Sequence, residues 1–151
     1  MFWKIVEALV RLIYFRRFHA LKRIGRAGEL MAAGRNEEAL ALLEKVGARL
    51  HQMLLPFWSF TRGRVLVQLG RLDEAEEALR LAVLTDPERG RADLELAVLA
   101  GRRFRFDECR EWLDRLDAKP DEDAKRKGGE IRALLASVED GSRARELEQC
   151  V

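Results

Sequence analysis

Apolar residues recur along the chain at helical spacing, and no segment alternates between apolar and polar residues as a half-buried strand does. The intervening residues are mainly Arg, Glu and Ala, which favour helices. Short breaks rich in Gly, Pro, Asn and Asp leave segments of roughly 12 to 18 residues, a usual helix length. Because such short connections make neighbouring helices antiparallel, the pattern predicts an all-α fold of helical hairpins.

Three segments share one order of residue types: a turn, an acidic pair, a small residue, and a leucine four positions later. The small residues are Ala39, Ala75 and Cys109, which lie 36 and 34 residues apart. Acidic residues in the first turn suit the positive end of the helix dipole, and a small residue one turn later allows two helices to approach closely. A repeat of this length predicts an α-solenoid, in which helical hairpins stack on one another.

The segment 56–89 resembles the tetratricopeptide repeat family. The positions that match are the family's small residues, its large apolar residue and its closing proline: Gly63, Ala75, Ala82, Leu79 and Pro87. The segment departs from the family pattern at Ser59 and Arg62, where the family has Trp and Leu. Weaker copies occupy 20–53 and 90–123, and we interpret 124–151 as a final hairpin. The resemblance implies a superhelical repeat domain over 20–151, preceded by a leader helix at 1–19.

The leader differs from the rest of the chain in both hydropathy and charge. Residues 1–15 are apolar apart from Lys4, Glu7, Arg11 and Tyr14. Residues 1–27 hold seven basic residues and one acidic residue, a net charge of +6, whereas the remainder carries −4. Fifteen helical residues span about 22 Å, less than the roughly 30 Å hydrocarbon core, so we expect no membrane span. We expect no cleaved signal peptide either, because charges interrupt the apolar run.

Three surfaces could cover the leader: the first repeat of the same chain, a second copy, or an anionic membrane surface. We expect packing on the first repeat, because no Gly or Pro precedes Gly25 and the helix can continue to about residue 33. The residues that would contact a membrane or a second copy are Phe2, Trp3, Leu9, Leu12, Ile13, Phe15, Arg16 and Arg17.

The sequence contains no evident catalytic, metal-binding or cofactor-binding constellation. His19 and His51 lack the spacing of metal ligands, and no phosphate-loop sequence follows Gly128. Cys109 holds a small-residue position of the repeat, which indicates a structural thiol. The arginine clusters lie in a net acidic body without interleaved aromatic residues, which argues against nucleic acid as a partner. We therefore predict a protein that is not an enzyme and holds no cofactor.

In the tetratricopeptide repeat family, the first helix of each hairpin lines a concave groove that binds peptides or helices. The resemblance thus implies a scaffold that binds another protein or a peptide. By repeat register, the groove residues are Leu21, Ile24, Met31, Phe57, Phe60, Arg64, Val67, Arg91, Leu94, Val98 and Arg132. The alternative is a peripheral membrane adaptor that docks through the leader. We expect the protein in the cytoplasm or on the inner face of a membrane, and self-association stays open.

Overall fold

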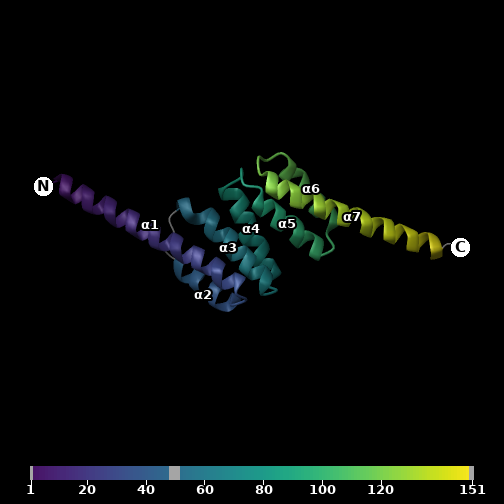
Figure 1. Ribbon diagram of the computed structural model, residues 1–151, viewed down its shortest axis with the longest axis horizontal. Helices are drawn as coiled ribbons and strands as arrows, with labels where there is room; N and C mark the ends of the chain where they lie inside the picture. The colour runs from purple at the N-terminus through teal and green to yellow at the C-terminus, as the bar shows by residue number, and fades with distance from the viewer. Residues whose placement is uncertain (1, 48–51, 150–151) are drawn as a thin grey trace. The chain divides into compact units, whose positions relative to one another are not determined.

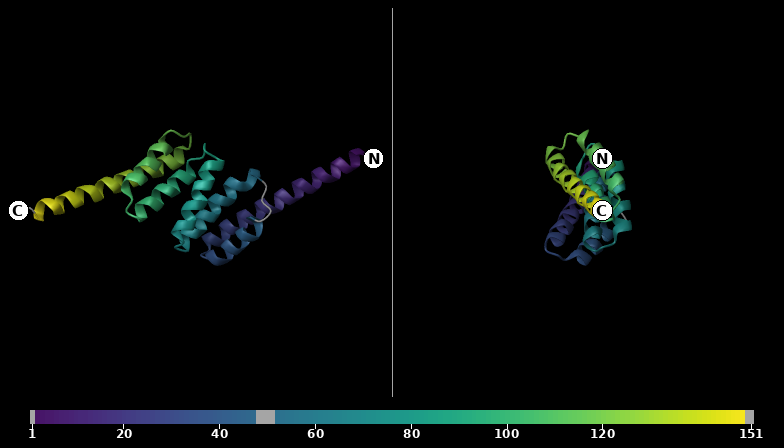
Figure 2. Two further views of the ribbon diagram at one scale, coloured as in Figure 1. Left: turned by 180° about the vertical axis from the view of Figure 1, so that it is seen from behind. Right: turned by 90° about the vertical axis from the view of Figure 1, so that its right-hand side faces the viewer.

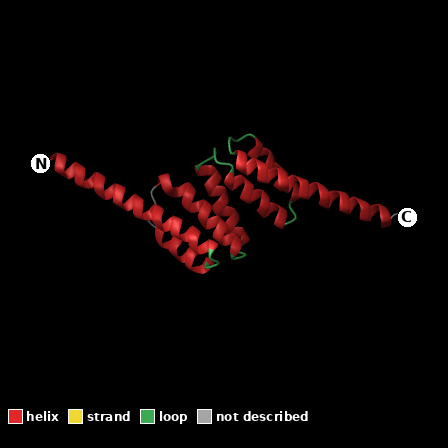
Figure 3. Ribbon diagram, viewed as in Figure 1, coloured by secondary structure: helices red, strands yellow, loops and turns green. Residues whose placement is uncertain are grey.

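The computed structural model describes the backbone of residues 2–47 and 52–149, and the side chains of residues 6, 10–15, 17–47 and 52–138. Within these ranges the chain forms α-helices and one short 3₁₀ helix, with no strand, so the all-α prediction is confirmed (Figures 1 and 3). The elements are α1 (Phe2–Ala32), α2 (Asn36–Gly47), η1 (Gln52–Leu54), α3 (Leu55–Gln68), α4 (Leu72–Thr85), α5 (Arg91–Arg102), α6 (Phe106–Asp117) and α7 (Glu122–Gln149).

The chain divides into two compact units. Unit 1 covers Met1–Thr85 and contains α1 to α4; unit 2 covers Asp86–Val151 and contains α5 to α7. In unit 1, α1 packs on α2 and α3, α2 packs on α3, and α3 packs on α4. In unit 2, α5 packs on α6, and α7 packs on both. The boundary falls at the Asp86–Pro87 break, where proline disfavours helical dihedral angles in the preceding residue.

Three hairpin turns share one backbone geometry. Gly34, Gly70 and Phe104 have left-handed φ angles of 75°, 74° and 58°. The N–H of each donates to the carbonyl three residues earlier, at 3.0, 3.2 and 3.0 Å. The N–H of the following arginine donates to the carbonyl five residues earlier, at 2.9, 3.0 and 2.9 Å. These bonds satisfy carbonyls at the helix end, and glycine adopts such a φ without strain. The turns recur at the predicted period.

An ion pair follows each of these turns. Each turn's arginine contacts the glutamate three residues later at 2.6 Å, in the pairs Arg35–Glu38, Arg71–Glu74 and Arg105–Glu108. The hydrogen bond from arginine lowers the pKa of Glu38 and of Glu74 below its usual value. The first two pairs are exposed, so they mark the start of the second helix and add little stability.

The α3–α4 contact in unit 1 depends on small residues. A Cβ atom on Gly63 would lie 2.7 Å from Cγ of Leu79 and 3.3 Å from the carbonyl oxygen of Ala75. Ala75 and Leu79 are fully buried, as the repeat register predicts. Both residues that depart from the family pattern have polar partners. The buried Ser59 hydroxyl donates to the Leu55 carbonyl at 2.7 Å, and Arg62 lies near the carboxylates of Glu44 and Glu74.

Unit 2 has an apolar core and a buried ion pair. The core residues are Ala97, Ala100, Cys109, Leu113, Leu116, Ala124 and Leu135. Burial raises the pKa of the Cys109 thiol, consistent with the structural role predicted for it. Beside this core, the fully buried carboxylate of Asp93 accepts a hydrogen bond from Lys119, and Arg115 lies 3.6 Å from its other oxygen. Removing one charge of such a buried pair is costly, because the other charge is left buried without its partner.

The prediction of a final hairpin is wrong. Residues 122–149 form one helix, α7, which continues through the predicted break at Asp140–Gly141–Ser142. A single glycine inside a helix costs about 1 kcal/mol and does not by itself end the helix. Gly128 packs against Leu116 and Leu113, where an added Cβ would lie at 3.0 and 3.3 Å. Gly128 therefore serves helix packing in unit 2.

α1 is continuous from Phe2 to Ala32, so the predicted extension of the leader into the first repeat is confirmed. The expected packing of the leader on that repeat is wrong for the described side chains Leu12, Ile13 and Phe15, which are 52%, 46% and 63% exposed. The reason is length: α1 has 31 residues, whereas α2 has 12 and α3 has 14. The side chains of Phe2, Trp3, Leu9 and Arg16 lie outside the described residues. None of the described helices is long and apolar enough to cross a membrane.

Candidate functional site

One face of α3 carries the groove residues predicted for the second repeat. Phe57, Phe60, Arg64 and Val67 fall within an arc of about 80° on the helix. Phe57 is 38% exposed, and the other three side chains are half-buried. The structure therefore brings these four predicted residues together on one accessible surface, which we call the α3 face.

The remaining sides of α3 are occupied within unit 1. Gly63 packs directly against α4. The Trp58 ring lies over Gly47, and its indole N–H donates to the Leu43 carbonyl at 2.8 Å. Arg62 lies 3.6 and 3.7 Å from the carboxylates of Glu44 in α2 and Glu74 in α4. These contacts fix the rotation of α3 about its axis, so they determine which residues form the α3 face.

The α3 face combines aromatic, aliphatic and cationic groups. The Arg64 guanidinium lies 5.8 Å from the centroid of the Phe60 ring, within the range of a cation–π interaction. Aromatic residues and arginine are enriched in protein interfaces because they bury large apolar areas and still offer hydrogen-bond donors.

The predicted groove residues of α1 differ from those of α3 in exposure. Leu21 is 45% exposed and Met31 is half-buried. Ile24, which has the same register position as Phe60, is only 4% exposed and lies in the core with Ala27. Of the three groove residues predicted in α1, Leu21 and part of Met31 are therefore accessible, whereas Ile24 is not.

The predicted groove residues of unit 2 have varied surroundings. Arg91 is exposed and lies 4.0 Å from Asp121, whereas Leu94 packs against the apolar core and Val98 is half-buried. Arg132 of α7 contacts two carboxylates of α6, Asp117 at 2.6 Å and Asp114 at 3.0 Å. The primary role of Arg132 visible in the structure is thus to join α6 to α7.

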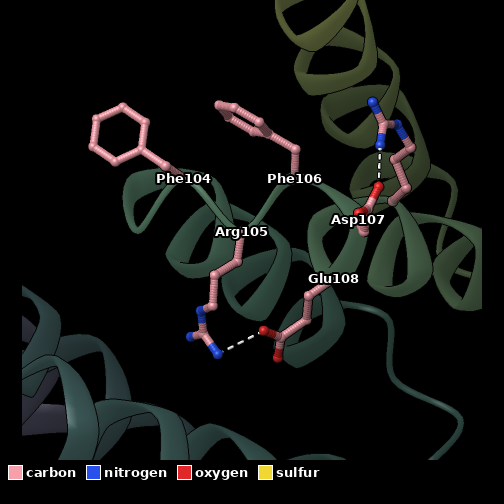
Figure 4. A pocket seen from close by; sticks show the side chains of 6 residues that line it. Phe104, Arg105, Phe106, Asp107 and Glu108 are labelled. Atoms are coloured by element: carbon pink, nitrogen blue, oxygen red, sulfur yellow. Dashed lines mark hydrogen bonds and ion pairs between the residues drawn. The ribbon is translucent and has the colours of Figure 1, made fainter.

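Sequence analysis did not find an open pocket at the turn between α5 and α6 (Figure 4). Its volume is about 550 Å³, and its lining residues are Phe104, Arg105, Phe106, Asp107, Glu108 and Arg110. Phe104 is 80% exposed, and its ring meets Phe106 edge to face at a centroid distance of 6.2 Å. Figure 4 shows both rings on one side of the turn and the Arg105–Glu108 ion pair on the other. One feature of the sequence could have indicated this pocket: Phe104 stands where the other two turns have glycine.

The charged groups that line this pocket are largely paired with one another. Both of its carboxylates are engaged by arginine at 2.6 Å, in the pairs Arg105–Glu108 and Arg110–Asp107. Its lining contains no histidine, cysteine or hydroxyl side chain. Among the residues that the structure describes, no group of three or more His, Cys, Asp or Glu side chains could hold a metal ion.

The repeated turns, the buried small residues and the paired helices define a helical-repeat protein with a tetratricopeptide-repeat-like fold. Among solved structures, the chain is similar to the tetratricopeptide repeat domain of Sgt2 from Aspergillus fumigatus, with a TM-score of 0.68. That likeness covers 83% of this chain and 82% of the Sgt2 domain chain, at 17% sequence identity. No sequence model of a protein family matches the chain, and no curated protein sequence matches it significantly. The predicted α-solenoid fold is confirmed by the structural likeness.

Proposed function

We propose that this protein is a non-enzymatic scaffold that binds a helical segment of another protein on the α3 face. The observation that carries the proposal is the concentration of Phe57, Phe60, Arg64 and Val67 on one accessible side of a helix whose other sides are packed. The helical-repeat fold supports the proposal, because such folds present rows of helix faces to elongated partners.

The composition of the α3 face defines the partner that fits it. Phe57 and Val67 are 10 residues apart, so they span about 15 Å along the helix, or about three turns. A partner helix with apolar residues at i, i+3 or i+4, i+7, and i+10 or i+11 would cover that length. An acidic residue near its centre would meet Arg64, which stands over Phe60. We therefore propose an amphipathic, mildly acidic helix as the bound element.

A peptide library displayed on phage tests this function with a defined probe. The full chain is used for selection, and the enriched peptides are then measured against two variants. Phe57→Glu places a charge on the α3 face, whereas the matched control Leu84→Glu places one at an α4 residue that is 78% exposed. We expect Phe57→Glu to weaken binding by roughly a factor of ten or more, and Leu84→Glu to leave it unchanged.

Two results would overturn the proposal. The first is failure of the library to yield any peptide with helical spacing of apolar residues. The second is equal binding of the selected peptides to both variants, which would place their site elsewhere. Circular dichroism of both variants verifies that each keeps the helical fold, which is expected because both substituted side chains are exposed.

A further inference from the structure

We propose that the N-terminal part of α1 docks on an anionic lipid surface and lies in the plane of the membrane interface. This segment, which we call the α1 arm, comprises residues 2–23. It is separate from the α3 face, and the proposal does not depend on partner binding there. The N-terminal part of the α1 arm extends beyond the ends of α2 and α3 (Figures 1 and 2).

The first observation is the exposure of apolar side chains around the α1 arm. Val10, Leu12, Ile13, Phe15 and Phe18 are 44%, 52%, 46%, 63% and 55% exposed. Residues 10–15 are all exposed in succession, although a single packed face would bury one residue in every three or four. An exposed apolar surface of this extent marks an interaction site.

The second observation is how widely these side chains are distributed around the helix. At 100° per residue, Leu12, Ile13 and Val10 spread over about 160°, and Phe15 and Phe18 lie on the remaining side. One neighbouring helix covers a stripe of about 100°. A single packed helix would therefore leave part of this apolar surface in water. Immersion at the boundary between headgroups and acyl chains covers a wider arc.

Charge favours a lipid surface over the pairing of two α1 arms from two copies of the chain. After Glu7 the α1 arm contains no acidic residue, and its basic residues there are Arg11, Arg16, Arg17, Lys22 and Arg23. Two such arms side by side would repel each other. An anionic lipid surface attracts this excess of positive charge. The exposed side chains of Arg11, Lys22 and Arg23 can reach the headgroups while the helix axis lies deeper, whereas the half-buried Arg17 contacts Met53 of η1 at 3.7 Å.

Local geometry in the α1 arm fits an interface between water and lipid. The Lys22 ammonium lies 4.6 Å from the centroid of the Phe18 ring, so a charge and an apolar ring share one position on the helix. Tyr14 is 68% exposed, and tyrosine favours the headgroup level because its ring is apolar and its hydroxyl polar. Because no described helix can cross a membrane, the α1 arm would lie on the surface.

Vesicle co-sedimentation of the full chain tests the proposal. One set of vesicles is phosphatidylcholine alone, and the other contains about 30% phosphatidylglycerol. We expect sedimentation with the anionic vesicles at about 100 mM salt and much weaker sedimentation at about 500 mM, because salt screens the attraction. Binding to neutral vesicles that equals binding to anionic vesicles would overturn the role assigned to the charges.

Two variants and a control locate the lipid contact. Leu12→Ser/Phe15→Ser removes two exposed apolar side chains, and we expect its vesicle affinity to fall roughly tenfold or more. Lys22→Glu/Arg23→Glu reverses two exposed charges and should lower affinity at least as much. Leu84→Ser removes an exposed apolar residue of α4 and should bind vesicles as the unchanged chain does.

Melting temperature and light scattering complete the test. We expect Leu12→Ser/Phe15→Ser to melt at the temperature of the unchanged chain, because both side chains are exposed in the folded unit. A lower melting temperature would show that the body of unit 1 covers them, and the proposal would fail. A dimer that dissociates in this variant, without vesicle binding by the unchanged chain, would assign the α1 arm to a second copy and also overturn the proposal.

Discussion

The α3–α4 hairpin of unit 1 and the α5–α6 hairpin of unit 2 share one turn geometry. They differ in the residue at the left-handed position of that turn and in the residues buried beside it. Both turns contain the same two backbone hydrogen bonds and the same arginine–glutamate pair. Unit 1 uses Gly70 at the left-handed position, and Gly63 brings its helices close together. Unit 2 places Phe104 at the left-handed position and buries the Asp93 carboxylate against Lys119.

This difference separates what the repeat requires from what each copy adds. The turn and the small residues of the second helix recur, so they define the hairpin. The phenylalanine at the strained position and the buried charge occur in the α5–α6 hairpin, and neither is the most stable choice for a helical hairpin. The exposed ring of Phe104 forms one wall of the α5–α6 pocket, which links the strain to a surface feature.

The largest expected effect comes from removing the cation of the buried pair. Lys119→Met leaves the fully buried Asp93 carboxylate without its closest partner, so we expect the free energy of unfolding to fall by about 3–5 kcal/mol. Urea denaturation followed by circular dichroism measures the change. The matched control Lys127→Met removes an exposed lysine of α7 and should have little effect. A small loss of unfolding free energy in Lys119→Met would contradict this expectation, because the Asp93 carboxylate would then be solvated well enough without the lysine.

The next effect tests the close packing of α3 on α4. We expect Gly63→Ala and Ala75→Leu each to lower the free energy of unfolding by about 1–3 kcal/mol, because the added atoms meet buried neighbours. Gly129→Ala is the control: no atom lies within 4 Å of its added Cβ, and alanine favours a helix, so stability should rise by up to about 1 kcal/mol. If Ala75→Leu melted at the unchanged temperature, the repeat register would be wrong.

Exchanging the residues of the two turns gives a smaller effect. Phe104→Gly should raise the free energy of unfolding by about 1 kcal/mol, because glycine adopts a φ of 58° without the steric cost of a Cβ atom. Gly70→Phe should lower it by about 1–2 kcal/mol for the same reason. Thermal unfolding of both variants provides the comparison. A loss of stability with Phe104→Gly would show that the contact with Phe106 outweighs the backbone strain.

The smallest effect concerns Cys109 and pH. Burial raises the pKa of its thiol in the folded state, so the folded chain binds more protons than the unfolded chain above the ordinary thiol pKa of about 8.5. The contribution of the thiol to the free energy of unfolding should therefore be fully present below that pH and fall as the pH rises above it. Unfolding measured at several pH values tests this in a Cys150→Ser background. Adding Cys109→Ala should remove the part of the slope that the thiol causes, and an unchanged slope would contradict the assignment.

The sequence predicted those features of the fold that depend on local chemistry. Residue type and spacing predicted the turns that follow Met31 and Val67, the acidic first turn of the second helix in each hairpin, and the burial of Ala75. The pair Asp93–Lys119 could not be predicted, because its members are 26 residues apart and meet only after unit 2 has folded. The break expected near Gly141 failed because a glycine weakens a helix without ending it.

The candidate surfaces likewise combine features that the sequence predicted with features that it could not predict. The register predicted that Phe57, Phe60, Arg64 and Val67 share one side of α3, because helical spacing alone determines that grouping. Exposure was harder to predict. Ile24 has the same register as Phe60 but is buried, since burial depends on the neighbouring helices of each repeat. Likewise, the apolar pattern of the leader could not determine whether the chain itself covers Leu12 and Ile13.

Photo-crosslinking from the α3 face tests the central claim, that this chain is a scaffold with a partner-binding helix face. Benzoylphenylalanine replaces Phe57 in one variant and the exposed Leu84 in another, and both full-length proteins are irradiated in their native cells. The account predicts a discrete crosslinked protein from position 57, absent from position 84. The same adducts from both positions, or none from position 57, would contradict it.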